Sequence, residues 1–343
     1  MNPLHVEFMA TMAASAATKA QPLNGVLAFA LAVLVYPGLI VAVIAAWALS
    51  WARQWVRAVA ARQSTPTPLR ELTELRAALD RDTVTPDGVA PLAVAGASAV
   101  AAIFPLLALL LLPLPGNPLV ASLGLTGDIV VEGGLLLGVP VARILLGWIV
   151  PSPYTRLAAD RSARLLAGVA VVMILALAAN AEQLSSLSLA LAHSTEPLPT
   201  FALITRLLAA LAFVSTLPAL AHTSSLRSAR PGGELMAGEL TELSGADLAG
   251  FRLAEAFQLV AVAAVFTAVF ILPLFPGAFG TQKTLLWLAG VVLTALGIGA
   301  WDGFALRSAA PAQERPPLTY WLGLPLLVAM LALVAAAWAS RGV

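Results

Sequence analysis

Cysteine is absent from the 343 residues of this chain, and histidine occurs only three times, at His5, His193 and His222. Without cysteine the chain can form no disulfide, no thiolate zinc site and no cysteine-ligated iron–sulfur cluster of its own. The three histidines lie too far apart in sequence to show the spacing of a metal site. We therefore expect neither a metal nor a bound cofactor in this chain, so any redox chemistry would take place in partner chains.

Charged residues are also scarce. Only 11% of the residues are Asp, Glu, Lys or Arg, whereas 60% are hydrophobic. A soluble domain is nearer half apolar and a quarter charged, so the composition excludes an ordinary water-soluble protein. The 19 basic and 18 acidic residues nearly cancel, which gives no general attraction to nucleic acid. The composition predicts a protein surrounded by the lipid bilayer, without a nucleic-acid partner.

Long apolar runs are abundant. A helix that crosses a hydrocarbon core of about 30 Å needs roughly 20 mostly apolar residues. Eight stretches reach about this length, at residues 25–50, 91–113, 129–150, 165–181, 201–221, 253–275, 284–301 and 318–339. We therefore predict an all-α, polytopic integral membrane protein with about eight transmembrane helices. They would form a single membrane domain, residues 25–343, after an N-terminal outer segment, residues 1–24.

Basic residues are distributed unevenly among the predicted loops. The loops after the first, third, fifth and seventh spans carry 14 Lys or Arg residues, whereas those after the second, fourth and sixth carry only Lys283. Basic residues accumulate in cytoplasmic loops. We therefore expect both termini outside, in a multi-pass protein of the cell membrane, with the cytoplasmic loops at about residues 51–90, 151–164, 222–252 and 302–317.

The first of these loops contains a helical pattern. Between Pro68 and Asp82 the chain is polar, and leucines recur at helical spacing at positions 69, 72, 75 and 79. This pattern predicts an amphipathic helix that lies along the membrane face.

Four ionisable residues fall within the predicted spans. Glu132 and Arg143 lie in the third span, Arg206 in the fifth and Glu255 in the sixth. Charges inside a bilayer are costly, so such residues are functional candidates. Simpler interpretations are available, because Arg206 is close to a helix end and could extend to water. Glu255 could pair with Arg252, one helical turn earlier. For Arg143, a structural ion pair and a functional role both remain open.

The stretch from Arg230 to Gln258 concentrates acidic residues at the entrance of the sixth span. Clustered carboxylates at a membrane boundary raise one another's proton affinity, which suits a proton relay or a polar docking site. A solvated amphipathic linker would give the same pattern. The five acids of this stretch are Glu234, Glu239, Glu242, Asp247 and Glu255.

Two patches carry a family pattern. The motif E-L-x-A-G-x-x-T-E-Y-S-G, followed by an aromatic helix start and a Glu, is matched by Glu234-Leu235, Ala237-Gly238, Thr241-Glu242, Ser244-Gly245, Phe251 and Glu255. Leu243 replaces the usual Tyr. A second pattern is matched by Gly147-Trp148, Ser152, Tyr154 and Arg161. In these residues, and in its eight predicted spans, the chain resembles the subunit 1 family of respiratory complex I. That family includes the mitochondrial subunit 1 and the anchor subunits of membrane-bound nickel–iron hydrogenases.

The resemblance implies a role without catalysis by the chain alone. In that family the subunit joins a cytoplasmic iron–sulfur redox arm to the other membrane-arm subunits. It would be a non-redox subunit of an NADH (or other donor):quinone oxidoreductase and translocase, with quinone as the substrate at the subunit interface. Glu234, Glu242 and Glu255 would be acids of the quinone chamber or of the proton-coupling path, Arg161 a basic partner, and Ser244-Gly245 a tight turn at the chamber wall. Glu239 and Asp247 are further candidates.

Other positions depart from the family. Val169-Ala170 stands where the family has a Tyr-Glu pair, Ala52-Arg53 stands near the end of the first helix where it has Glu-Arg, and Ser225–Arg230 replaces an acidic run. Several acids of the expected relay are therefore missing, which leaves a purely structural anchor as one hypothesis.

Two further hypotheses concern other kinds of protein. Gly127-Asp128 is similar to the hydrogenase branch, which would make the chain the anchor of a membrane-bound hydrogenase or formate hydrogenlyase. A secondary transporter could be built around Glu132, Arg143 and Glu255, although no internal repeat supports it.

Overall fold

The computed structural model describes the membrane-spanning part of the chain and the segments next to it. The described residues are 25–85, 88–114, 117, 127–184, 200–221, 240, 242–275, 281–307 and 318–341. The predicted outer segment, residues 1–24, lies outside them, as do Glu234, Glu239 and most of the predicted loop 222–252.

The described residues are 84% helical and contain no strand, which confirms the predicted all-α membrane fold. The helices, in chain order, are α2 (Gly25–Leu34), α3 (Leu39–Ala61), α4 (Arg70–Leu79), α5 (Pro91–Leu111), α7 (Ile129–Leu136), α8 (Gly138–Ile149), α9 (Pro153–Leu184), α10 (Thr200–Leu220), α11 (Gly245–Phe266), α12 (Thr281–Arg307) and α13 (Leu318–Arg341). A π turn, Thr267–Ile271, and a short 3-10 turn, Leu272–Leu274, continue α11.

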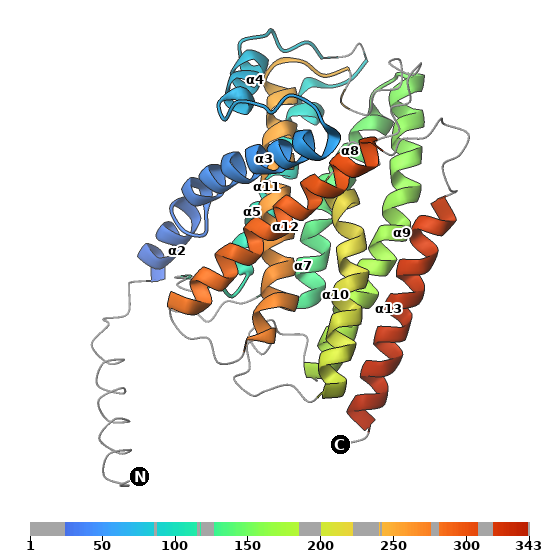
Figure 1. Ribbon diagram of the computed structural model, residues 1–343. Coiled ribbons are helices and arrows are strands. Elements are labelled where there is room, and N and C mark those ends of the chain that lie inside the picture. The colour runs from blue at the N-terminus through green and yellow to red at the C-terminus, as the bar shows by residue number, and fades with distance from the viewer. Residues whose placement is uncertain are drawn as a thin grey trace.

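Seven stretches of the described chain are long and apolar enough to cross a membrane, from Phe29–Ala61 to Thr281–Ala305. The eighth predicted span corresponds to α13, in which the apolar described part, Gly323–Trp338, is shorter. Successive spans run in alternating directions, and α4 and the start of α9 lie at one end of the bundle (Figure 1). We call this the α4 end; it corresponds to the face that the basic residues predict to be cytoplasmic.

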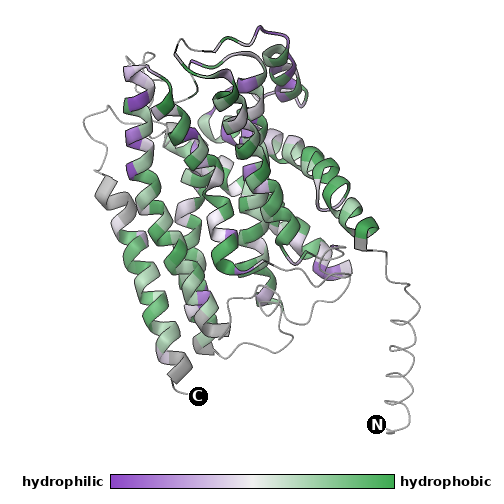
Figure 2. Cartoon of the chain, turned by 180° about the vertical axis from the view of Figure 1, so that it is seen from behind, coloured by the Kyte–Doolittle hydropathy of each residue, from purple (hydrophilic) through white to green (hydrophobic). Residues whose placement is uncertain are grey.

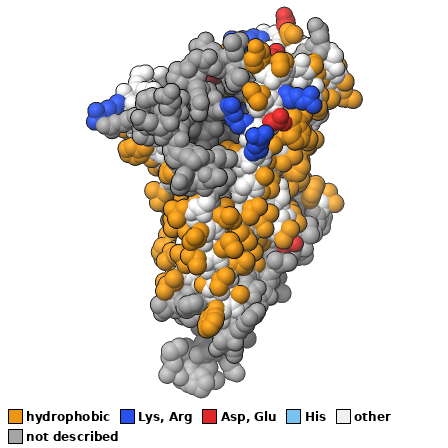
Figure 3. Space-filling model, turned by 90° about the vertical axis from the view of Figure 1, so that its right-hand side faces the viewer, with side chains coloured by type: hydrophobic (Ala, Val, Ile, Leu, Met, Phe, Trp, Pro, Cys, Tyr) orange, Lys and Arg blue, Asp and Glu red, His pale blue; other side chains and the backbone are white. Residues whose placement is uncertain are grey.

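Helix α11 is the centre of the bundle. In the most apolar 18-residue stretch of its span, Gly245–Leu274, 89% of the residues are buried, against at most 61% in the corresponding stretches of the other six spans. Helix α5 packs on α11, α3 packs along α12, and α9 and α10 both pack on α13. The flanks are covered by hydrophobic side chains, and polar residues gather toward the α4 end (Figures 2 and 3). A charged residue on the inner face of α11 is therefore removed from both water and lipid.

Several helices extend beyond the apolar runs that predict them. Helix α3 continues to Ala61, and α9 begins at Pro153, so most of the predicted loop 151–164 is helical. Helix α11 begins at Gly245 and α12 ends at Arg307, inside the predicted loops 222–252 and 302–317. The reason is that Ala and Arg are strong helix formers. Hydropathy locates the edge of the membrane, but the helix continues past it into water.

The third predicted span is broken into α7 and α8 at Leu137. Pro140 has no backbone N–H, so the carbonyl of Leu136 loses its helical donor. The side chain of Gln258 on α11 replaces that donor, because its Nε2 donates to the Leu136 oxygen at 2.6 Å. This bond joins α11 to the break, between the positions of Glu132 and Arg143.

Two glycines allow α12 to lie directly on the backbone of α3. A Cβ atom at Gly299 would lie 2.4 Å from the carbonyl oxygen of Arg53, and one at Gly303 would lie 2.5 Å from that of Arg57. Beside this contact, Arg57 Nε lies 3.3 Å from Asp302 Oδ2, and the Asp302 side chain is buried. Small residues and an ion pair thus fix α3, which positions the segment that follows it.

Candidate functional site

An ion pair lies inside the bundle, between α8 and α11. Arg143 Nη1 donates to Glu255 Oε1, although the two residues are 112 positions apart. Their side chains are 8% and 20% exposed, respectively. The structure thus shows an interhelical partner for Glu255. In such surroundings each charge compensates the other, and the loss of either partner would remove an ion pair from the apolar interior.

Two more acids precede Glu255 on the same segment. Glu242 is exposed just before α11, and Asp247 is buried in its first turn. Asp247, Phe251 and Glu255 follow one another at intervals of four residues, so they share one face of α11. At 1.5 Å per residue, the eight residues from Asp247 to Glu255 span about 12 Å. Acidic groups therefore extend from the α4 end to the Arg143 ion pair in the interior.

The tight turn predicted at Ser244-Gly245 is present and is held by a second segment. Gly245 has a φ of +63°. Ser244 Oγ donates to the carbonyl of Asp82 and accepts from the N–H of Val84, both at 2.9 Å. The N–H of Ala246 donates to Thr83 Oγ1 at 3.2 Å. The turn at the start of α11 is thus fastened to residues 82–84, which follow α4.

The remaining sequence candidates are not all brought together. Arg161 is exposed on the first half of α9. In the same region Trp148 Nε1 donates to Asp160 Oδ1 at 2.8 Å, which connects the end of α8 to α9. Glu234 and Glu239 lie outside the described residues. Of the candidate acids, the structure therefore places Asp247 and Glu255 on one face of α11, and Glu242 on the segment that precedes this helix.

Glu132 on α7 is almost completely buried, with 1% of its surface exposed. Neither of its carboxylate oxygens has a hydrogen-bond partner among the residues that the structure describes. Asp128, one turn earlier, is the N-cap of α7, and its Oδ1 accepts from the N–H of Val131 at 2.7 Å. Glu132 is therefore in a different situation from Glu255, because no group among the described residues balances its charge.

Two buried polar contacts were not predicted from the sequence. Arg206 Nε donates to Asn180 Oδ1 at 3.0 Å, and both residues are at most 1% exposed. The interpretation that Arg206 extends to water is therefore wrong. Gln258 was also missed, although a signal for it exists: a proline within a helix leaves a carbonyl four residues earlier without a donor. The partner that supplies the donor cannot be read from the sequence.

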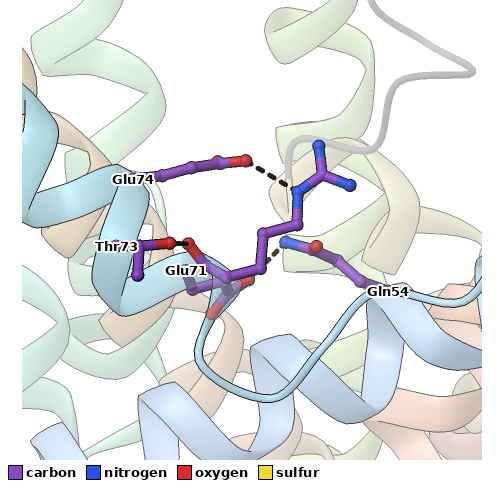
Figure 4. Close-up of polar contacts among 5 residues, drawn as sticks. Gln54, Glu71, Thr73 and Glu74 are labelled. Atoms are coloured by element: carbon purple, nitrogen blue, oxygen red, sulfur yellow. Dashed lines mark hydrogen bonds and ion pairs between the residues drawn. The ribbon is translucent and has the colours of Figure 1, made fainter.

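The segment after α3 folds back onto it and carries the predicted amphipathic helix, α4. Trp47 Nε1 donates to the carbonyl of Pro68 at 2.9 Å, and Trp51 Nε1 donates to that of Pro66 at 3.3 Å. Gln54 Nε2 donates to Glu71 Oε1, and these side chains point toward one another in Figure 4. Three side chains of α3 thus hold α4 at this end of the bundle.

Docking of α4 is expected to weaken as the pH rises toward 7. Burial raises the pKa of Glu71 to about 7, from an ordinary value of 4.5, while Arg53 opposes the shift. The docked state then binds the proton more tightly than the undocked state. Docking is therefore strongest below pH 4.5, weakens between about 4.5 and 7, and is constant above. Hydrogen exchange of residues 63–82 should show protection that falls severalfold, at most about tenfold per pH unit.

The Glu71→Gln variant removes the titrating group, so its protection should not depend on pH once the intrinsic exchange rate is corrected. Glu74→Gln is the matched control, because Glu74 is exposed and pairs with Arg70 at 2.7 Å (Figure 4). A wild-type pH dependence that persists in Glu71→Gln would contradict this assignment.

Comparison with known proteins places this arrangement in context. A family model described as NADH dehydrogenase matches residues 29–339. Among solved structures, the fold matches a chain of the membrane-bound sulfane sulfur reductase (MBS), described as an archaeal respiratory membrane complex, with a TM-score of 0.67. That chain is 19% identical, and the match covers 87% of this chain and 97% of the other. No curated protein matches the sequence. At this identity the structural match concerns the fold alone.

Proposed function

This chain belongs to the NADH dehydrogenase family, the family of subunit 1 of respiratory complex I, and we propose that it forms the quinone-binding junction and the start of the proton-coupling path in a complex I-like oxidoreductase. The chain is a multi-pass membrane subunit, and we propose that the redox centres lie in its partner subunits. We further propose that it lies in the cell membrane, and that its partners are an iron–sulfur arm at the α4 end and other membrane-arm subunits along its apolar flanks.

The observation that carries this proposal is the succession of acids from Glu242, just before α11, through Asp247 to the Arg143–Glu255 ion pair on that helix. A row of carboxylates that begins at the surface and continues into the membrane interior can take up a proton at one end and pass its charge inward. Glu255 is held by Arg143, so protonation of Glu255 would release the arginine. A change of charge at the α4 end, as in quinone reduction, can therefore alter an ion pair in the interior.

The missing family acids limit where such a path can run. Val169, at the position of the expected Tyr-Glu pair, is buried in the apolar core. That position offers no titratable group, so the proposed path depends on α8 and α11. The family match over residues 29–339 does not favour the hydrogenase-anchor and transporter hypotheses.

Replacing Glu242 with Gln should reduce quinone-linked turnover about tenfold or more, because a relay group that cannot exchange a proton loses an acid–base contribution of that order. Assembly should be unaffected, since Glu242 is exposed. The complex would be purified through a tag on this chain and its subunits identified by mass spectrometry. Reduction of decylubiquinone by the physiological donor, and proton uptake, would then be measured.

Glu74→Gln is again the control, since it removes an exposed acid that lies outside the row. Unchanged turnover and proton uptake in a fully assembled Glu242→Gln complex would exclude the relay role. Recovery of the chain alone, stable and monodisperse, would contradict membership in a larger complex. A co-purifying nickel–iron subunit would move the assignment to the hydrogenase branch.

A further inference from the structure

Polar groups continue along the seam between α7–α8 and α11 beyond the Arg143–Glu255 pair, toward the end of the bundle opposite α4. Gln258 lies one turn after Glu255 on α11 and contacts the backbone of α7 through the Leu136 carbonyl. Glu132 lies one turn below Leu136 on α7, and Asp128 caps that helix at its far end. Arg143 lies 15 residues after Asp128, which corresponds to about 22 Å of helix, most of a hydrocarbon core of about 30 Å.

Some buried side chains on this part of the seam have oxygen atoms that accept no hydrogen bond from the described residues. Gln258 Oε1 and both oxygens of Glu132 are buried and have no hydrogen-bond partner in the described part of the chain. Unsatisfied acceptors in an apolar interior are costly, and they are satisfied by a donor such as water or by a proton on the carboxylate itself. Both of these donors, bound water and an exchangeable proton, are components of a proton path.

No cation of the described residues offsets the charge of Glu132. Asp128, on the same helix, is itself negative and is occupied as the N-cap. Helix α5, which packs on α7, contains no ionisable residue. The described charged side chains of α9 lie between Arg156 and Arg164, and those of α11 lie between Asp247 and Glu255, all toward the α4 end. Burial without a counter-charge favours the neutral acid.

The carboxyl group of Glu132 packs against the backbone just before α7. A Cβ atom at Gly127 would lie 2.8 Å from Glu132 Oε1, so the carboxyl group and the backbone of that glycine are close together. A larger residue would displace the carboxyl. Glu132 is therefore buried, but it lies within one helical turn of the end of the helix.

We propose that Glu132 is a protonated acid that exchanges its proton along this seam, so that the chain carries its own proton route from the Arg143–Glu255 pair to the end of the bundle opposite α4. The proposal extends the proposed function, on which it rests for the coupling role of that pair. A proton that protonates Glu255 releases Arg143, then passes through water bound at Gln258 Oε1 to Glu132. Glu132 gives up the proton that it held before, past Asp128. No electron moves in these steps, and each carboxyl returns to its starting state.

Infrared spectroscopy of the purified complex tests the route without the need for an electron donor. The infrared spectrum of the wild type minus that of Glu132→Gln, both at neutral pH, should contain the carbonyl stretch of a protonated carboxylic acid. The spectrum of Glu74→Gln should still contain this band. After transfer to D₂O the band should shift within minutes, before the amide groups of the buried helices exchange. In Gln258→Leu the shift should be at least tenfold slower.

Three results would overturn the proposal: the absence of a Glu132-dependent carboxylic acid band, a band that exchanges only as slowly as the core amides, or a band that shifts as fast in Gln258→Leu as in the wild type. If Gln258→Leu or Glu132→Gln fails to assemble, the wild-type band still decides, and Glu132→Asp identifies it by a frequency shift. The outcome is separate from the quinone role. A rapidly exchanging Glu132 with full turnover in Glu242→Gln would leave the route standing and remove the proposed function.

Discussion

Replacing Glu255 with leucine should destabilise the subunit by about 3–5 kcal/mol, because it removes the carboxylate that pairs with the buried guanidinium of Arg143. Arginine keeps its charge in a protein, so Arg143 cannot become neutral when Glu255 is removed. Arg143→Leu should cost less. The remaining Glu255 is 20% exposed, and it can become neutral by taking up a proton. The two single variants should therefore be destabilised to different extents. A count of lost contacts would predict equal destabilisation, because both lose the same ion pair.

The double variant Arg143→Leu/Glu255→Leu separates stability from function. Replacement of a whole buried ion pair by apolar residues is often neutral or stabilising, so the double variant should regain most of the stability. If the pair couples quinone chemistry to proton movement, turnover-linked proton uptake should nevertheless be lost. Thermal denaturation of the purified complex and its proton uptake would be measured together.

The exposed pair Arg70–Glu74 provides the control, since exposed ion pairs contribute little. Arg70→Leu should leave the denaturation midpoint almost unchanged. Equal midpoints for Glu255→Leu and Arg70→Leu would show that the interior pair is solvated and would contradict its role as a buried pair. A stable double variant with full proton uptake would identify the pair as structural.

The positions of the membrane helices could be predicted because the length of an apolar run is set by the thickness of the bilayer. Their ends could not. Helix α9 continues for several turns past its apolar part, with Arg156, Arg161 and Arg164 on helical positions. Hydropathy changes at the membrane surface, whereas helix propensity does not. The break between α7 and α8 was missed for a related reason, since Pro140 lies within an uninterrupted apolar run.

For the site, the sequence identifies the charged residues whose burial in the membrane costs free energy, but it does not identify which of them contact one another. Glu132, Arg143 and Glu255 stand out because a charge within an apolar run requires an explanation. The pairing of Arg143 with Glu255 depends on how α8 packs against α11, and the pattern along one helix carries no information about that. The alternative partner for Glu255, Arg252, is close in sequence, which is why sequence reasoning reaches it first.

The family resemblance implies a turn at Ser244-Gly245, at the start of α11. Gly245 has a φ of +63°, a backbone conformation that residues with a Cβ atom avoid. What the sequence did not indicate is the second segment, Asp82–Val84, whose backbone and hydroxyl groups complete the turn. That contact joins residues more than 150 positions apart and could only be found in the fold.

Gly245→Ala should be strongly destabilising for two reasons that add. Its φ of +63° costs a residue with a Cβ atom about 1–2 kcal/mol. In addition, the new Cβ would lie 2.6 Å from the Cα of Thr83 and 2.8 Å from its backbone nitrogen, so a flexible side chain cannot absorb the clash. The segment after α4 must move away, and the bonds of Ser244 to Asp82 and Val84 are lost.

Gly88→Ala is an unusually close control for this substitution. Gly88 also has a positive φ, +82°, but a Cβ atom there would meet nothing within 4 Å. It should therefore show the cost of the backbone conformation alone. Hydrogen exchange of residues 82–84 should increase at least tenfold in Gly245→Ala relative to Gly88→Ala. Quinone-linked turnover should also fall, because Glu242 and Asp247 flank the displaced turn. If the two alanine variants behave alike in both measurements, the contact between the turn and Thr83 does not hold the start of α11, and the acids on that helix are positioned by the bundle alone.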